Sequence, residues 1–236
     1  PAQALAADGP AATIDLRNYF AVPGLAGTQF AQFNTVLGRF NVELRTDVAP
    51  RHVANFLAYV QAGSYTNTFF HRAASFDGGA VSIVQAGGYR VPLPPTDVPK
   101  RAPVALEYNL PNARGTLAAA RTTDINSATS EWYFNVRDNS TNLNQSNGGG
   151  YTVFGRVLGT GMSVVDAIAA VPRVNAGSPF NELPARNVAN NTIVEANLIV
   201  VTSVAQVSLF PTGSGGSIME FSLQNSAPAV VGAVLS

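Results

Sequence analysis

Hydrophobic and polar residues alternate in short runs along most of this chain. In the run Arg39–Leu44, for example, every second residue is apolar, and a period of two predicts a strand with one buried face. Similar short runs, separated by clusters of Pro, Gly and Asn, make up most of the remainder, which is typical of an all-β protein. Exposed strand edges promote aggregation unless the sheet closes on itself. We therefore predict a mainly β protein, a barrel with helices over its open ends.

Two segments instead show helical spacing. Pro50 suits the first turn of a helix, and apolar residues at positions 53, 56, 57 and 60 follow at helical intervals until Gly63. A second helix is predicted near Ser163, where Ser163 and Asp166 can form a capping box. The chain is thus expected to contain only two helices.

Charge and cysteine content exclude several classes of function. The chain has 14 basic and 14 acidic residues, so it carries no electrostatic footprint for nucleic acid or for anionic membranes. Only 12% of residues are charged, and a surface poor in charge resists self-association less than an ordinary one. The absence of cysteine excludes disulfides, thiol catalysis and cysteine-ligated metals.

The start of the sequence bears on localisation. It begins with Pro1 rather than Met and continues with an Ala-rich stretch, as expected after removal of a signal peptide, with an arbitrary boundary as the alternative. We therefore expect an exported protein, periplasmic or extracellular. Apolar runs such as Asn197–Val201 are far shorter than the roughly 20 residues of a membrane span, so no membrane span is expected.

Four segments carry candidate chemistry. Two strand-like runs flank a small polar loop within Arg114–Asp138, and Phe70-His71-Arg72 places one cation beside aromatic rings. These are the parts of an apolar groove with one strong hydrogen-bond donor. Together with Gln85–Gly88 and Tyr151–Val157, and in this order and approximate spacing, they resemble the cyclophilin family of peptidyl-prolyl isomerases. The upstream region 37–56 resembles the opening strand and first helix of that family.

The resemblance spans roughly residues 33–205 and implies a closed antiparallel eight-stranded barrel capped by two helices. Residues 1–32 then form an N-terminal extension, and residues 206–236 form a C-terminal β-hairpin and apolar tail. This tail either packs on the barrel or offers a strand to a neighbouring subunit, because an exposed apolar edge invites β-augmentation. The second alternative implies a homo-oligomer or polymer formed through residues 206–236.

The resemblance implies that Arg72 and Gln85 are the catalytic residues. Prolyl isomerisation is a rotation about a partial double bond with a barrier of about 18–20 kcal/mol, and it needs neither a nucleophile nor a metal. A guanidinium that donates to the prolyl nitrogen stabilises the twisted state more than the planar ground state. Arg72 matches the arginine with this role, and Gln85 matches the glutamine that binds the substrate backbone and holds the arginine. We expect no cofactor.

A pocket for the proline ring is implied as well. Tyr133 matches its aromatic floor, with Trp132 on the opposite, core-facing side of the strand. Residues 120–122 match the backbone segment that receives the residue preceding proline. The expected substrate-binding residues are Phe70, Phe76, Ala120, Arg121, Thr122, Glu131, Tyr133, Leu143 and Tyr151.

One departure from the family pattern lies just before Gln85. Ser82 stands where the family has an aromatic wall of the proline pocket, and residues 75–80 lengthen the segment between Arg72 and Gln85. Phe76, which is carried on this insertion, is hypothesised to fold back and fill the empty slot.

Two further departures weaken the expected groove. Asn142 stands where the family has another aromatic wall, and a lost large apolar side chain weakens peptide binding unless something replaces it. Glu131 replaces a glutamine, and its carboxylate is expected either to pair with Arg72 and hold it away from the substrate or to orient it. His71 alternates with Arg72 and is expected to face the core rather than to act as a metal ligand.

We expect from these features an exported peptidyl-prolyl cis-trans isomerase that acts on proline-containing peptides and proteins and assists protein folding. The alternative is a cyclophilin-like structural or binding protein with a weakened groove, which self-assembles through its terminal extensions as an extracellular polymer subunit. The low charge content and the departures at Ser82, Glu131 and Asn142 favour the alternative, whereas the presence of both Arg72 and Gln85 argues against it.

Overall fold

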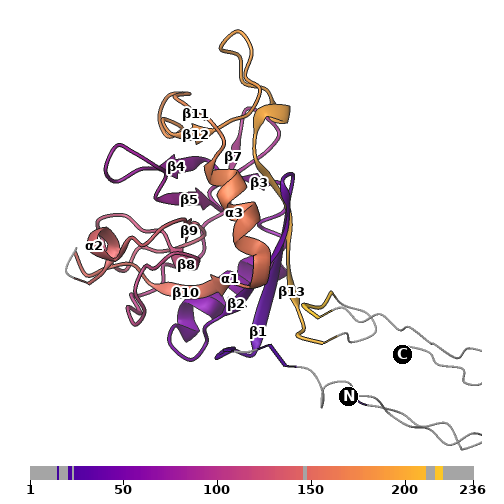
Figure 1. Cartoon of the computed structure of the whole chain (residues 1–236). Coiled ribbons are helices and arrows are strands. Elements are labelled where there is room, and N and C mark those ends of the chain that lie inside the picture. Colours follow the sequence, from indigo (N-terminus) through magenta and orange to yellow (C-terminus); the bar gives the residue numbers. More distant parts are fainter. Residues whose placement is uncertain (1–14, 16–20, 23, 146–147, 211–215, 220–236) are drawn as a thin grey trace, which may run out of the picture.

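The computed structural model describes residues 15, 21–22, 24–145, 148–210 and 216–219 (Figure 1). Eleven strands in this part of the chain form one antiparallel sheet, and two more form a separate hairpin. The sheet contains β1 (Gln29–Thr35), β2 (Gly38–Leu44), β3 (Thr68–Phe69), β4 (Arg72–Ala74), β5 (Ile83–Ala86), β6 (Tyr89–Arg90), β7 (Thr96–Asp97), β8 (Thr116–Ala119), β9 (Trp132–Asn135), β10 (Val153–Val157) and β13 (Val200–Val207). The hairpin consists of β11 (Arg173–Val174) and β12 (Leu183–Pro184).

The sheet curls round, so that two strands far apart in the strand order are joined by one short stretch of chain. The strand order is β4-β5-β9-β8-β10-β2-β1-β13-β3-β6-β7, yet only Phe70 and His71 separate β3 from β4. The N–H of Phe70 donates to Ile199 O, and the N–H of His71 donates to Gln85 O, each at 3.0 Å. The prediction of a mainly β, barrel-like fold is therefore confirmed. The strand count differs from eight because β3 and β4 are two pieces of one bent segment and β6 and β7 extend the edge.

The first predicted helix is present over the expected residues. α1 (Pro50–Gln61) has Pro50 in its first turn and buries one face, including Val53, Phe56 and Val60. Gly63 follows with a φ of 62°, a left-handed conformation that glycine adopts without steric cost and that ends the helix.

The second predicted helix is also present, but its predicted capping box is wrong. α3 (Met162–Ala169) begins directly after the 3₁₀ turn η2 (Gly159–Gly161). The Ser163 hydroxyl donates to Thr160 O at 2.8 Å, and the Asp166 carboxylate pairs with the Arg114 guanidinium at 2.6 Å. Both side chains are therefore engaged elsewhere. The short α2 (Ser140–Leu143) and the 3₁₀ turn η3 (Glu195–Asn197) were not predicted.

The two longer helices cover the ends of the curled sheet (Figure 1). α1 contacts β10 and β13, and α3 contacts β2 and β5. Neither pair consists of neighbours in the strand order. A helix reaches such separated strands by crossing an end of the curled sheet, so the expectation of helical caps agrees with these contacts.

An aromatic cluster fills the space inside the sheet. The ring of Phe33 stacks on Phe40 with centroids 5.1 Å apart, and it meets Trp132 and Phe134 edge-on. Trp132 is therefore part of the main core, as predicted. Because neighbours on a strand point to opposite faces, Tyr133 belongs to a second, smaller cluster on the other side of the sheet.

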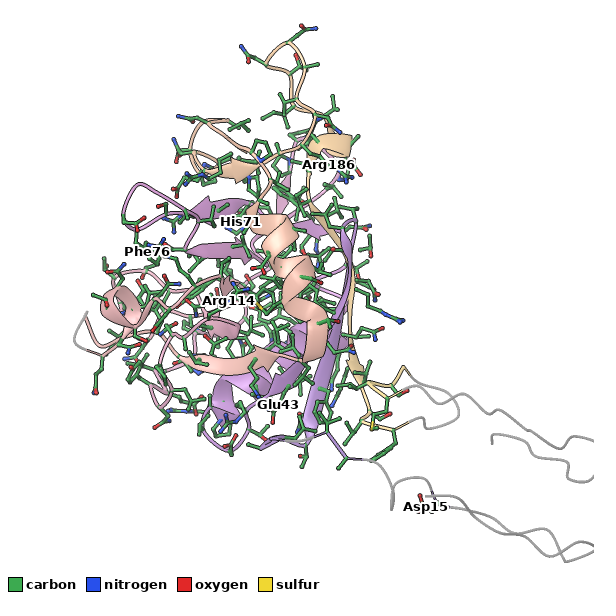
Figure 2. The ribbon with its side chains drawn as sticks, in the orientation of Figure 1. Asp15, Glu43, His71, Phe76, Arg114 and Arg186 are labelled. Atoms are coloured by element: carbon green, nitrogen blue, oxygen red, sulfur yellow. The ribbon has the colours of Figure 1, made fainter. Side chains whose placement is uncertain are left out.

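One polar residue of β2 is buried, although the alternation along this strand predicts that it faces solvent. Glu43 is fully buried, where its carboxylate pairs with Arg156 from β10 and accepts the backbone N–H of Ala26. The chain that precedes β1 covers this carboxylate, and the pairing compensates for removal of the charge from water. Figure 2 shows Glu43 at the lower end of the sheet.

Two structural facts bear on the domain boundaries expected from the sequence. The boundary at residue 33 falls inside β1, and the boundary after residue 205 falls inside β13. Most of the expected C-terminal tail lies outside the described residues. Within the part that the structure describes, no helix has the length and apolar character needed to cross a membrane.

Candidate functional site

Arg72, Gln85 and Tyr133 lie side by side on the outer face of three neighbouring strands. Arg72 on β4 is directly opposite Gln85 on β5, and Gln85 is directly opposite Tyr133 on β9. Side chains opposite one another on adjacent strands project from the same face of the sheet. The register therefore brings together the two residues expected to be catalytic and the residue expected to form the pocket floor.

The guanidinium of Arg72 is held by a carboxylate from a distant part of the chain. Its Nε donates to Glu182 Oε2 at 2.9 Å, and Arg173 Nη1 lies 3.8 Å from the other oxygen of Glu182. The N–H of Ala73 also donates to the backbone carbonyl of Glu182 at 2.8 Å, which fixes that segment beside β4. The carboxylate that pairs with Arg72 is thus that of Glu182 and not that of Glu131, the partner expected from the sequence. Nothing in the local sequence around Glu182 indicated its role.

Glu131 instead faces Gln85 and His71. Gln85 Nε2 donates to Glu131 Oε2 at 2.6 Å, and His71 Nε2 lies 3.4 Å from the same oxygen. Burial acts to raise the pKa of Glu131, but hydrogen bonds from His71 and Gln85 and the charges of His71 and Lys100 outweigh it. The pKa of this carboxyl therefore lies below its ordinary value, and Glu131 is an anion at neutral pH.

His71 is buried, as the alternation along the strand predicted. Its side chain is 4% exposed, and its ring meets Tyr89 edge-on with centroids 5.0 Å apart. Among the described residues no group of three His, Cys, Asp or Glu side chains is placed to hold a metal ion.

An apolar cluster surrounds Tyr133 beside the Arg72 row. Tyr133 is 2% exposed, and its hydroxyl donates to Asn112 Oδ1 at 2.8 Å. Burial raises the pKa of this hydroxyl well above its ordinary value, so Tyr133 remains a neutral donor. Asn112 was not among the residues predicted for the site, because its place before the Arg114 motif carried no signal of this role. The other buried members of the cluster are Ala74, Ile83, Ala118, Leu143 and Val153.

Phe76 packs against this cluster, as the hypothesis about the insertion requires. Its backbone N–H donates to the hydroxyl of Ser82 at 3.2 Å, and Ser82 is fully buried. Ser82, which stands where an aromatic wall was expected, thus anchors the segment that carries the ring of Phe76. Asp77 pairs with Arg137, and this hydrogen bond with others from Gly79 and Ser75 lowers the pKa of Asp77 to about 2.

The segment expected to receive the residue preceding proline lies at the edge of the same cluster. Ala120 and Tyr151 pack against it, and the rings of Tyr133 and Tyr151 have centroids 6.0 Å apart. Thr122 is exposed, and its N–H donates to Ser127 Oγ at 2.9 Å. Arg121 lies with its guanidinium over the Tyr151 ring. A hollow of about 450 Å³ opens here, lined by Arg121, Thr122, Thr123, Gly148 and Tyr151.

Burial distinguishes three residues that were expected at or near the pocket. Phe70 is fully buried in the main core, with its ring edge-on to Trp132 at 5.8 Å, so it supports the strand from inside and does not line the outer face. Asn142 is exposed on α2, whereas its neighbour Leu143 is buried in the Tyr133 cluster. Leu143 therefore packs beside Tyr133, its role in substrate binding stays a prediction, and Asn142 supplies no wall.

This arrangement places one cation beside an apolar cluster, whose partly buried edge includes Phe76 and Tyr151. Arg72 has a half-exposed side chain, and within the described residues its two Nη atoms have no protein partner. It can therefore donate to a nitrogen or oxygen of a ligand whose apolar part rests against the Tyr133 cluster. Such a site can bind and polarise an amide without forming a covalent bond to it.

Comparison with known proteins agrees with this arrangement. Residues 30–194 match the family model of the cyclophilin type peptidyl-prolyl cis-trans isomerases. The chain is 42% identical over 146 residues to peptidyl-prolyl cis-trans isomerase cyp18 of Streptomyces antibioticus, covering 59% of this chain and 82% of the relative. It is 38% identical over 160 residues to a peptidyl-prolyl cis-trans isomerase of Acinetobacter baylyi, covering 66% of this chain and 80% of the relative.

Solved structures show the same fold. A cyclophilin type peptidyl-prolyl cis-trans isomerase of Cryptosporidium parvum, crystallised in the presence of the dipeptide Ala-Pro, superimposes with a TM-score of 0.54 at 20% identity. The alignment covers 75% of this chain and 98% of that structure. A second crystal structure of the same protein gives a TM-score of 0.54 at 19% identity and covers 75% of this chain and 96% of that one.

Proposed function

The chain belongs to the cyclophilin type peptidyl-prolyl cis-trans isomerase family, and we propose that the row formed by Arg72, Gln85 and Tyr133 catalyses rotation about Xaa-Pro peptide bonds. The observation that carries this assignment is the register of β4, β5 and β9, which places the three side chains on one face. The substrates are then proline-containing peptides and proteins.

The mechanism follows from what each group can do. The apolar cluster around Tyr133, with Phe76 and Tyr151 at its edge, binds the proline ring. An Nη of Arg72 donates to the prolyl nitrogen as this atom becomes pyramidal, which stabilises the twisted state more than the planar ground state. Glu182 occupies the Nε of Arg72 and so leaves both Nη atoms for the substrate. No bond to the enzyme is formed at any step.

An isomerisation assay on a short proline-containing peptide tests this proposal. Wild type should accelerate the interconversion, and Arg72→Ala should lower kcat/KM by about a hundredfold, the usual effect of removing one positioned donor. Peptide affinity should change much less, because the apolar contacts remain. Arg186→Ala is the matched control: Figure 2 shows Arg186 at the upper end of the molecule, away from Phe76. Equal rates in wild type and Arg72→Ala would overturn the assignment.

Assistance to protein folding belongs to the same proposal. The hollow beside Tyr151 is at the surface, where a segment of an unfolded chain can reach it. Uncatalysed prolyl isomerisation takes tens to hundreds of seconds and limits the folding of many proteins. Wild type should therefore shorten the slow refolding phase of a client limited by a proline bond, and Arg72→Ala should not.

A further inference from the structure

Arg121 is a cation that the surrounding backbone fixes in place. Its Nε donates to Gly150 O at 3.1 Å, its Nη1 to Thr122 O at 2.8 Å, and its Nη2 to Gly148 O at 2.8 Å and to Gly150 O at 2.9 Å. Its Cζ lies 4.2 Å from the centre of the Tyr151 ring. The guanidinium is thus immobilised by carbonyl groups and an aromatic face.

The charge of Arg121 is nevertheless not neutralised. Among the described residues no carboxylate forms an ion pair with it, and the nearby Asp124 turns its carboxylate back to accept the N–H of Asn126 at 2.9 Å. A guanidinium carries five N–H donors, and the four hydrogen bonds to carbonyls leave one N–H on Nη1 without a partner. Arg121 therefore has both a free charge and a free donor at the hollow.

The hollow lies within reach of a peptide bound at Tyr133. Tyr151 links the two, since its ring centre is 6.0 Å from that of Tyr133 and 4.2 Å from Arg121 Cζ. The guanidinium is thus within about 10 Å of the pocket floor, a span that two residues of extended peptide, at about 3.3–3.6 Å each, cover together with the length of an acidic side chain.

We propose that the hollow lined by Arg121 and Tyr151 is a subsite for an acidic side chain located one or two residues before the proline of the substrate. The inference rests on the proposed isomerase function, because it places the proline at Tyr133. The remaining N–H of Arg121 donates to the carboxylate, and the fixed guanidinium supplies a charge that needs no reordering when the peptide binds.

The test uses two peptide series that vary Glu, Gln and Lys, one immediately before the proline and one at the preceding position. In at least one series kcat/KM should fall from Glu to Gln and again from Gln to Lys, by about two- to fivefold at each step, as for other exposed ion pairs. Raising the salt concentration should reduce this preference. Peptide dissociation constants, measured by fluorescence anisotropy, should follow the same order.

Three variants show whether Arg121 causes the preference. Arg121→Gln should remove it, and Arg121→Lys should keep part of it because the charge remains. Arg186→Gln, which changes the net charge equally at a distant site, should leave it intact. If wild type isomerises and binds all peptides equally in both series, the subsite is overturned and the isomerase function stands. If wild type neither isomerises nor binds any peptide, the proposed function and the subsite both fail.

Discussion

Arg72 and Glu182 form an ion pair, Nε to Oε2 at 2.9 Å, between residues 110 positions apart in the sequence. Glu182 is in turn 3.8 Å from Arg173 Nη1, so the carboxylate is shared between two cations. Its own backbone is fixed to β4 through Ala73. A half-exposed arginine on a strand would otherwise sample many rotamers, and this contact limits them. Glu182 is therefore a positioning residue for Arg72.

Replacement of Glu182 by Ala should lower kcat while leaving KM nearly unchanged. A partly exposed ion pair contributes up to about 1 kcal/mol, so a loss of about three- to fivefold in kcat is expected. Glu182→Gln, which retains an acceptor for Nε, should restore part of the loss. Steady-state kinetics with a proline-containing peptide measure both parameters.

The control for this variant is Asp47→Asn, which removes the partner of Arg45 in another exposed pair away from the Arg72 row. It should leave kcat and KM unchanged. An increase of kcat in Glu182→Ala would show instead that the carboxylate restrains Arg72 from reaching the substrate.

Phe76 should contribute to peptide affinity, since it packs at the edge of the Tyr133 cluster. Phe76→Ala removes a partly buried ring, and we expect KM to rise by about five- to tenfold with little change in kcat, from the loss of about 1–1.5 kcal/mol of apolar contact. Val194→Ala, a truncation at an exposed apolar position, is the control. Unchanged peptide affinity in Phe76→Ala, measured by anisotropy, would remove this ring from the binding site.

Glu131 should make stability depend on pH. Its pKa is lower in the folded protein than its ordinary value, because the hydrogen bonds from His71 and Gln85 and the charges of His71 and Lys100 outweigh burial. The stabilisation by the carboxylate is therefore present above the ordinary pKa of about 4.3–4.5 and is lost as the pH falls through the lower folded-state value.

Glu131→Gln should consequently differ most from wild type near pH 7 and least near pH 3.5, in free energies of unfolding from urea denaturation. Glu195→Gln, at an exposed position on η3, should show a smaller pH-dependent difference. A gap between wild type and Glu131→Gln that stays constant from pH 7 to pH 3.5 would contradict the role assigned to the carboxylate.

The sequence predicted the parts of this molecule that depend on local pattern. Alternation and helical spacing located β2, α1 and α3, and the matched segments identified Arg72, Gln85 and Tyr133, whose common face the strand register then showed. Contacts across the fold were not predictable in this way. Glu182 reaches Arg72 from the β11–β12 hairpin, and Glu43 is buried by Arg156 and by the chain before β1. In each case the sequence near the acidic residue does not indicate its partner, which lies far away along the chain.

Asn112 should be a major determinant of stability at the site, since one buried amide satisfies several partners. Its Oδ1 accepts the Tyr133 hydroxyl at 2.8 Å, and its Nδ2 donates to Leu143 O at 3.0 Å and to Tyr151 O at 3.3 Å. Asn112→Ala leaves the Tyr133 hydroxyl and the Tyr151 carbonyl without this partner, at about 1–3 kcal/mol for each group, whereas Leu143 O still accepts the N–H of Tyr151 at 3.2 Å. We therefore expect a loss of about 3 kcal/mol or more in the free energy of unfolding.

A double-mutant cycle with Tyr133→Phe separates the hydroxyl from the rest of this network. Tyr133→Phe alone should cost about 1 kcal/mol and should leave isomerisation nearly unchanged, because the ring that forms the pocket floor remains. Asn112→Ala should cost less in the Tyr133→Phe background, since no buried hydroxyl is then left unpaired. Asn109→Ala, at an exposed position, should cost no more than about 1 kcal/mol. Strict additivity of Asn112→Ala and Tyr133→Phe would show that the hydrogen bond between them contributes nothing to stability.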